Sequence, residues 1–247
     1  MHRLGWREQG DGRLYLGAPL PAGRIADDGA LQLRTALREV VRRWHPRPIL
    51  TPNQDILLSE IAPEARAGVE ALLRAHGVPL AEELLPVKRW ALACPALPTC
   101  GLALAEAERV REPILEDIVR ALARHGLEAE PLSVRITGCP NGCARPFGAE
   151  IGIVGRTPGH YSVFVGGSFA GVRLARPLLD KVPQAQLGAA LEPLFALFKA
   201  EREPGERFGD FCARWDLRQG LSGGLRGGPP QARAPEWPVA QAMSSPW

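Results

Sequence analysis

Four of the five cysteines form two closely spaced pairs, and this feature constrains the chain more than any other. Cys94 and Cys100 enclose Pro-Ala-Leu-Pro-Thr, whereas Cys139 and Cys143 enclose Pro-Asn-Gly. Proline and glycine favour stiff turns in which neighbouring backbone N–H groups point inward. Cys212 has no cysteine neighbour, so we interpret it as a core or surface thiol rather than a ligand.

Three interpretations of the two pairs remain open from the residues alone. An odd number of cysteines in a chain without an export signal makes a poor disulfide framework, and inert buried thiols need no Pro/Gly loops. Structural zinc accepts four thiolates, but the five residues inside the first pair exceed its usual spacing. Four thiolates closing on a [4Fe–4S] cluster fit best, because backbone N–H groups hydrogen-bond to cluster sulfurs.

The composition indicates a globular chain. Its 247 residues are 45% hydrophobic and 23% charged, so they can bury a core. The net charge of +3 is too small and too dispersed to indicate nucleic-acid binding. No apolar run reaches the roughly 18–20 residues that span a bilayer, and the N-terminus lacks an export signal. We therefore predict a cytoplasmic protein with no nucleic-acid or membrane partner.

The hydrophobic pattern predicts an α+β fold whose first unit spans residues 1–86. A strand is predicted over residues 13–17 and a helix over residues 33–44. Two short strands at 49–51 and 56–58 precede a second helix, which begins at Pro63 and ends at His76–Gly77. With a last strand near residues 85–90, this order is that of a ferredoxin-like sandwich.

The second predicted unit spans residues 87–216. Helices are predicted over residues 102–110, 114–125 and 187–199, the middle one capped by Gly126. Strands are predicted over residues 132–137, 151–154 and 161–165, so the second cysteine pair follows a strand. Residues 217–247 contain a Gly/Pro-rich linker-like segment, and we predict a disordered tail there.

The cysteine loops resemble a known family. Residues 93–103 and 137–146 are similar to the cluster-binding loops of assimilatory sulfite reductases, the sirohaem enzymes related to nitrite reductases. Residues 50–54, 149–155 and 200–212 are similar to further segments of that family, so the resemblance covers roughly residues 5–216. The loop sequences look most like the ferredoxin-dependent type.

The resemblance implies the C-terminal half of a sulfite reductase: a ferredoxin-like half-domain followed by an α/β domain that binds sirohaem and a [4Fe–4S] cluster. It implies that Cys94, Cys100, Cys139 and Cys143 bind the cluster, and that Cys143 also ligates the sirohaem iron. The implied reaction is the six-electron reduction of sulfite to sulfide. Ferredoxin is the expected electron donor, with an NADPH-fed flavoprotein as the alternative. The chain itself has no Gly-rich dinucleotide fingerprint.

The resemblance also indicates what this chain lacks. The first half of such an enzyme normally carries the Arg/Lys cluster that binds sulfite, so no catalytic residue is assigned here. Arg145 and Arg135 are candidates to bind sirohaem carboxylates, and Asn141 to contact the cofactor; a structural role is the alternative for each. Asn53 and Gln54 lie in a segment that the family keeps near the interface of its halves, and we interpret them as structural.

Several alternatives follow from the absent half. We expect a fragment or split subunit, with the N-terminal half carried by a separate chain; the alternative is a chain that acts alone with a simplified site. A related nitrite reductase is a second possible activity. A non-enzymatic iron–sulfur electron-transfer module that has lost sirohaem is a hypothesis of another class, and a structural zinc protein is a further one.

Overall fold

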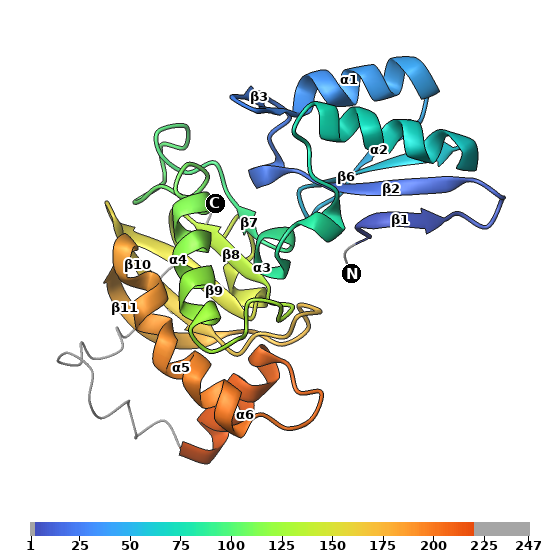
Figure 1. The fold of residues 1–247 in the computed structure, drawn as a ribbon. Helices are drawn as coiled ribbons and strands as arrows, with labels where there is room; N and C mark the ends of the chain where they lie inside the picture. The colour runs from blue at the N-terminus through green and yellow to red at the C-terminus, as the bar shows by residue number, and fades with distance from the viewer. Residues whose placement is uncertain (1–2, 220–247) are drawn as a thin grey trace, which may run out of the picture.

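The computed structural model describes residues 3–219, which form two α/β units (Figure 1). The first unit is a four-stranded antiparallel sheet with the order β1-β2-β6-β5, and α1 and α2 lie on one face of it (Figure 1). Its elements are β1 (Gly5–Glu8), β2 (Leu14–Pro19), a small ribbon of β3 (Asp27–Asp28) and β4 (Leu31–Gln32), α1 (Leu33–Trp44), β5 (Arg47–Leu50), β6 (Asp55–Ile61) and α2 (Arg66–Ala75).

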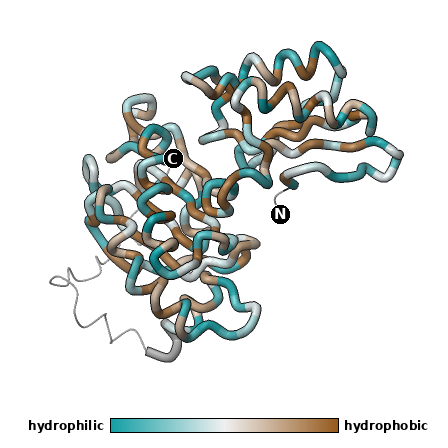
Figure 2. Tube along the Cα trace, viewed as in Figure 1, coloured by the Kyte–Doolittle hydropathy of each residue, from teal (hydrophilic) through white to brown (hydrophobic). Residues whose placement is uncertain are grey.

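The helices of this unit form because their apolar residues recur on one face. α1 buries Leu33, Ala36, Leu37 and Val40 at helical spacing against the sheet core. Figure 2 shows hydrophobic and hydrophilic residues alternating along the helices, and hydrophobic stretches along the strands of both units. The predicted strands and helices between residues 13 and 77 are thus confirmed, with small shifts in their ends.

The fourth strand comes from the N-terminus, so the strand predicted near residues 85–90 is wrong. β1 pairs with β2. Gly17 of β2 allows the N-terminal segment to approach closely, because a Cβ at this position would lie 1.9 Å from the Arg3 carbonyl oxygen. Residues 86–89 instead form the short helix α3 (Pro86–Arg89), in which Pro86 occupies the first turn, where its missing N–H is tolerated. Val87 is fully buried by this turn.

The second unit is a five-stranded sheet with the order β11-β10-β9-β8-β7. The strands β7, β8 and β9 run parallel, whereas β9, β10 and β11 are antiparallel neighbours. The helices α4 and α5 pack against each other beside this sheet (Figure 1). The elements are β7 (Leu92–Ala93), α4 (Arg111–Ala123), β8 (Val134–Thr137), β9 (Ile151–Thr157), β10 (His160–Val165), β11 (Arg176–Pro183), α5 (Leu187–Glu201) and α6 (Phe208–Gln219).

Residues 102–110 are not helical, which corrects the sequence prediction. The backbone N–H groups of Leu104 and Ala105 both donate to the Gly138 carbonyl, so they are not available for helical bonds. α4 begins at Arg111 and carries Pro113 in its first turn, and Gly126 follows it with φ +63°, as predicted for a cap. The predicted tail overlaps α6 at residues 217–219; residues 220–247 lie outside the described part of the chain.

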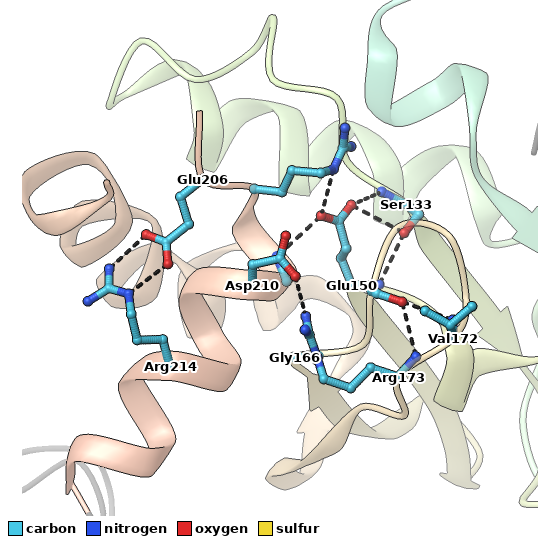
Figure 3. Close-up of polar contacts among 11 residues, drawn as sticks. Ser133, Glu150, Gly166, Val172, Arg173, Glu206, Asp210 and Arg214 are labelled. Carbon is cyan, nitrogen blue, oxygen red and sulfur yellow. Dashed lines mark hydrogen bonds and ion pairs between the residues drawn. The ribbon is translucent and has the colours of Figure 1, made fainter. Parts of the chain in front are cut away.

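A buried carboxylate holds α6 against the second sheet (Figure 3). Glu150 is fully buried, and its carboxylate accepts hydrogen bonds from the backbone N–H of Ser133 at 2.9 Å and of Gly209 at 3.2 Å. The Arg207 Nε atom lies 3.5 Å from the same carboxylate. Burial raises the pKa of the Glu150 carboxyl, while the Ser133 N–H and the Arg207 charge oppose that rise. Within residues 3–219, no helix is long and apolar enough to cross a bilayer.

Candidate functional site

The first cysteine loop leaves β7 at an edge of the second sheet. The Cys94 N–H donates to the Ile136 carbonyl at 3.1 Å, which continues the pairing of β7 with β8. Ala96 takes a left-handed backbone conformation with φ +51°, and the Cys100 N–H donates back to its carbonyl at 2.7 Å. The two cysteines of the first pair are therefore held on one closed turn.

The second loop meets the first at Gly138, the residue before Cys139. The Gly138 carbonyl accepts the N–H groups of Leu104 and Ala105 at 2.8 and 3.0 Å, and its own N–H donates to the Cys94 Sγ at 3.3 Å. A Cβ at Gly138 would lie 2.5 Å from both the Ala105 carbonyl oxygen and the Ala96 Cβ. The two predicted loops therefore converge in space, and only glycine fits their junction.

The second loop turns tightly enough to require a glycine inside it. Gly142 has φ +68°, a conformation that L side chains rarely adopt, and its N–H donates to the Cys139 carbonyl at 3.3 Å. The Arg145 N–H then donates to the Gly142 carbonyl at 2.7 Å. These bonds carry the chain from the buried Cys139 out to the exposed Cys143.

The four loop cysteines are free thiols that differ in exposure. Cys94 and Cys139 are buried, Cys100 is half-buried and Cys143 is exposed. Burial raises the pKa of the Cys94 thiol, the N–H groups of Gly138 and Ala96 lower it, and the charges of Cys143 and Cys139 raise it further. Cys212 is buried in α6, in agreement with a core thiol.

The donor set consists of four thiols and a backbone N–H that donates to one of them, which is the chemistry of an iron–sulfur site. Within the described residues, no three His, Cys, Asp or Glu side chains form a group that could hold one ion. A tetrahedral zinc site needs all four sulfurs about 2.3 Å from one ion. A [4Fe–4S] cluster instead accepts each thiolate on a different iron and takes N–H hydrogen bonds to its sulfurs, as the Gly138 N–H supplies at Cys94.

Arg135 is a buried cation beside the second loop. Its side chain is 7% exposed, and Nη1 donates to the Arg145 carbonyl at 3.1 Å. The buried Nε atom has no hydrogen-bond partner, and no carboxylate of the described residues pairs with the guanidinium. Burial and, as the smaller cause, the charge of Arg145 together lower the pKa of Arg135 to about 10. A buried cation without a counter-ion is suited to an anionic ligand.

Arg145 and Asn141 are placed differently from Arg135. Arg145 Nη2 donates to the Pro52 carbonyl at 2.7 Å and to the Asn53 Oδ1 atom at 2.9 Å, so the guanidinium contacts the first unit. Asn141 is exposed in the second loop, and its side chain has no hydrogen bond to the described residues. Contact of these two residues with a cofactor remains a prediction.

The sequence reasoning missed how closely Gln54 approaches the first cysteine loop. Its side-chain amide donates to the Ala93 carbonyl at 2.6 Å and accepts the Ala93 N–H at 3.1 Å. These bonds confirm a structural role for Gln54, and they add a specific partner one residue before Cys94. The signal in the sequence was the Asn53–Gln54 motif itself, which does not indicate its partner.

Comparisons with known proteins agree with this architecture. Residues 7–76 match the nitrite/sulfite reductase ferredoxin-like half domain. A sulfite reductase (ferredoxin) of Synechococcus elongatus is 50% identical over 211 residues, which are 85% of this chain and 34% of that protein. A sulfite reductase (NADPH) hemoprotein beta-component of Myxococcus xanthus is 46% identical over 212 residues, 86% of this chain and 38% of that protein.

A solved structure shares the fold over most of the described residues. The Mycobacterium tuberculosis NirA protein superposes with a TM-score of 0.73 and 25% identity, covering 87% of this chain and 40% of that one. In each relative the matched region is part of one longer polypeptide, so the comparisons do not support a separate chain for the other half. Residues 7–76 of this α+β chain thus belong to the nitrite/sulfite reductase ferredoxin-like half-domain family, and the chain as a whole is similar to sulfite reductases while spanning 34–40% of the length of these relatives.

Proposed function

We propose that this chain is the C-terminal half of a sulfite reductase haemoprotein. The observation that carries the proposal is the junction of the two cysteine loops at Gly138, in a chain 50% identical to a sulfite reductase. The conclusion concerns the cofactor-binding half. The residues that bind sulfite would lie in the part of such an enzyme that this chain does not span.

In this proposal, Cys94, Cys100, Cys139 and Cys143 would hold a [4Fe–4S] cluster, and Cys143 would also bind the sirohaem iron. The exposure of Cys143, in contrast to the buried Cys94 and Cys139, supports the second role, because a shared sulfur must reach outward from the loop. When bound, the two cofactors would pass six electrons, one at a time, from the external electron donor to sulfite. The chain's own part is to fix the sulfurs and to donate the Gly138 N–H to Cys94.

Arg135 is the residue of this chain that best fits an anionic edge of sirohaem. Its guanidinium is buried, and among residues 3–219 it has no carboxylate partner and its Nε donor has no acceptor. A haem carboxylate would neutralise it through a charge-assisted hydrogen bond. Asn141 and Arg145 are further proposed contacts at the same loop.

The electron donor is proposed from the relatives. The Synechococcus elongatus protein is named for ferredoxin, and the Myxococcus xanthus protein for NADPH. We propose ferredoxin as the donor, because the relative named for it has the higher identity of the two. A flavoprotein fed by NADPH is the second candidate. Sulfite is the proposed substrate, and the family description keeps nitrite as the alternative.

Anaerobic reconstitution tests this function. The chain is incubated with iron, sulfide and sirohaem, alone and with a polypeptide that carries the first half of a ferredoxin-type sulfite reductase. We expect iron and acid-labile sulfide in the chain alone, and tetrapyrrole binding with sulfide production when both halves are present. A chain that takes up no iron and sulfide would refute the proposal. Iron and sulfide without tetrapyrrole in either mixture would identify an electron-transfer module instead.

Substitution Arg135→Met is expected to stabilise the metal-free chain while weakening sirohaem binding. The substitution removes a buried unpaired cation, and such changes stabilise proteins by about 1–2 kcal/mol when packing is kept. Because the folded-state pKa of Arg135 is lowered to about 10, the folded side chain is charged below that pH, and the penalty is fully present at neutral pH. It is relieved as the pH rises through about 10.

Urea unfolding of the metal-free chain at neutral pH and a sirohaem titration of the reconstituted pair measure these two effects. Arg156→Met serves as the matched control, because Arg156 already pairs with Asp180 at 3.2 Å and lies away from the cysteine loops. A loss of stability in Arg135→Met equal to that in Arg156→Met would contradict the unpaired-cation account.

A further inference from the structure

A turn of the first unit contacts residues that flank the two cysteine loops of the second unit. The turn, Thr51–Gln54, joins β5 to β6 and is braced internally, since the Thr51 Oγ1 atom accepts the N–H groups of Asn53 and Asp55 at 3.2 and 3.3 Å. Gln54 has φ +58°, a left-handed conformation that is uncommon for residues other than glycine. That conformation occurs where the side chain reaches across to the second unit.

Gln54 completes the free edge of the second sheet. Among the strands of residues 3–219, β7 is the outermost of this sheet and pairs with β8 alone, so no described strand lies on the other side of Ala93. The Gln54 amide takes that place, donating to the Ala93 carbonyl at 2.6 Å and accepting its N–H at 3.1 Å. Ala93 is fully buried, so both of its backbone groups would lose their partner if this amide were removed.

The same turn contacts the second loop through Arg145. The Arg145 Nη2 atom donates to the Pro52 carbonyl at 2.7 Å and to Asn53 Oδ1 at 2.9 Å, two residues after Cys143. The turn Thr51–Gln54 therefore contacts both Ala93, the residue before Cys94, and Arg145, the second residue after Cys143. Neither contact belongs to the cysteine loops themselves.

We propose that Gln54 is a positioning residue for the cluster ligands, acting on Cys94 through Ala93. Its role toward a cluster rests on the proposed function, whereas its role toward the Cys94 thiol does not. The bond from the Gly138 N–H to the Cys94 Sγ, 3.3 Å long, requires Cys94 to stay in register with the second loop. Hydrogen bonds to a ligating sulfur help to set the potential of a cluster, so a shift of Cys94 changes that potential.

Two glutamine variants separate this role from a general loss of packing. Gln54→Met keeps the length of the side chain and removes both hydrogen bonds to Ala93. Gln9→Met is the matched control, because the Gln9 Oε1 atom also accepts a backbone N–H, that of Glu60 at 2.5 Å, but entirely within the first unit. Gln54→Glu keeps an acceptor for the Ala93 N–H and replaces Gln54→Met if that variant does not fold.

The first readout is alkylation of the metal-free chain by iodoacetamide, with each cysteine followed by mass spectrometry. We expect Cys94 to react about tenfold faster in Gln54→Met than in the wild type, the factor that corresponds to about 1.4 kcal/mol of easier local opening. Gln9→Met is expected to react at the wild-type rate. Equal Cys94 rates in Gln54→Met and wild type, or equal acceleration in Gln9→Met, would overturn the proposal.

The second readout is the midpoint potential of the reconstituted cluster, followed by EPR. We expect a shifted potential in Gln54→Met and an unchanged one in Gln9→Met; an unshifted potential in Gln54→Met would overturn the role toward the cluster. A wild-type chain that takes up no iron and sulfide would instead refute the proposed function. The alkylation comparison needs no cofactor and would still decide the positioning role.

Discussion

Replacing Cys143 with serine is expected to abolish the electronic coupling between cluster and sirohaem and to reduce sulfite reduction by at least about 100-fold, because removing even a residue that hydrogen-bonds to a metal ligand typically costs about 10- to 100-fold. The hydroxyl of serine stays protonated at neutral pH, where a thiol that binds a metal is deprotonated. Cys143 is the exposed member of the four, so serine fits there without steric conflict. The deficit would therefore come from the lost sulfur rather than from misfolding.

The coupling is measured by EPR of the reconstituted halves, and the activity by sulfide production. Cys212→Ala is the matched control, because it removes a thiol that is buried in α6 at 3% exposure, apart from the cysteine loops. Burial raises the pKa of the Cys212 thiol well above its usual value. Full sulfite reduction by Cys143→Ser, or loss of the cluster in Cys212→Ala, would refute the assignment of the shared thiolate.

The cysteine loops were predictable because their chemistry is local. Proline and glycine inside each pair indicate tight turns, and the structure confirms turns at both, with Gly142 at φ +68°. The convergence of the loops was a weaker inference from the residues, because it depends on bonds between Gly138 and residues 104–105, more than thirty positions earlier. No periodic pattern in the sequence encodes such a contact.

The missed elements are those whose formation depends on neighbours distant in the sequence. β7 has only the residues Leu92 and Ala93 and exists because β8 lies beside it, so it is too short for an alternation pattern. β1 is a strand because Gly17 lets the N-terminal segment approach closely. Residues 102–110 have apolar residues at helical spacing, yet their N–H groups bond to Gly138. Tertiary contacts override local propensity in each case.

The side-chain candidates show the same limit. Arg135 and Arg145 were equivalent candidates in the sequence, but the fold buries Arg135 without a counter-ion and directs Arg145 to Pro52 and Asn53. This difference arises from the packing of the two units. The residues next to each arginine in the sequence do not indicate that packing. The roles of both residues toward a cofactor remain predictions.

Substitution Gly138→Ala is expected to destabilise the metal-free chain by about 2–3 kcal/mol, as overpacking does in a filled core. The added Cβ would lie 2.5 Å from the Ala105 carbonyl oxygen and 2.5 Å from the Ala96 Cβ, and neither group is the end of a flexible side chain. The two cysteine loops must separate to admit it. We therefore also expect iron and acid-labile sulfide uptake to fall, because the Gly138 N–H would move away from the Cys94 Sγ.

Gly101→Ala is the matched control for this prediction. Gly101 lies beside Cys100 in the first loop, but a Cβ there would meet no atom within 4 Å, and its φ does not require glycine. Urea unfolding and iron and sulfide content should therefore match the wild type in Gly101→Ala and fall together in Gly138→Ala. If Gly138→Ala is destabilised but takes up as much iron and sulfide as the wild type, the junction serves folding alone and is not needed to position the cysteine sulfurs. If stability and iron and sulfide uptake both fall, the positions of the cysteine sulfurs depend on the close packing at Gly138, where a methyl group has no room.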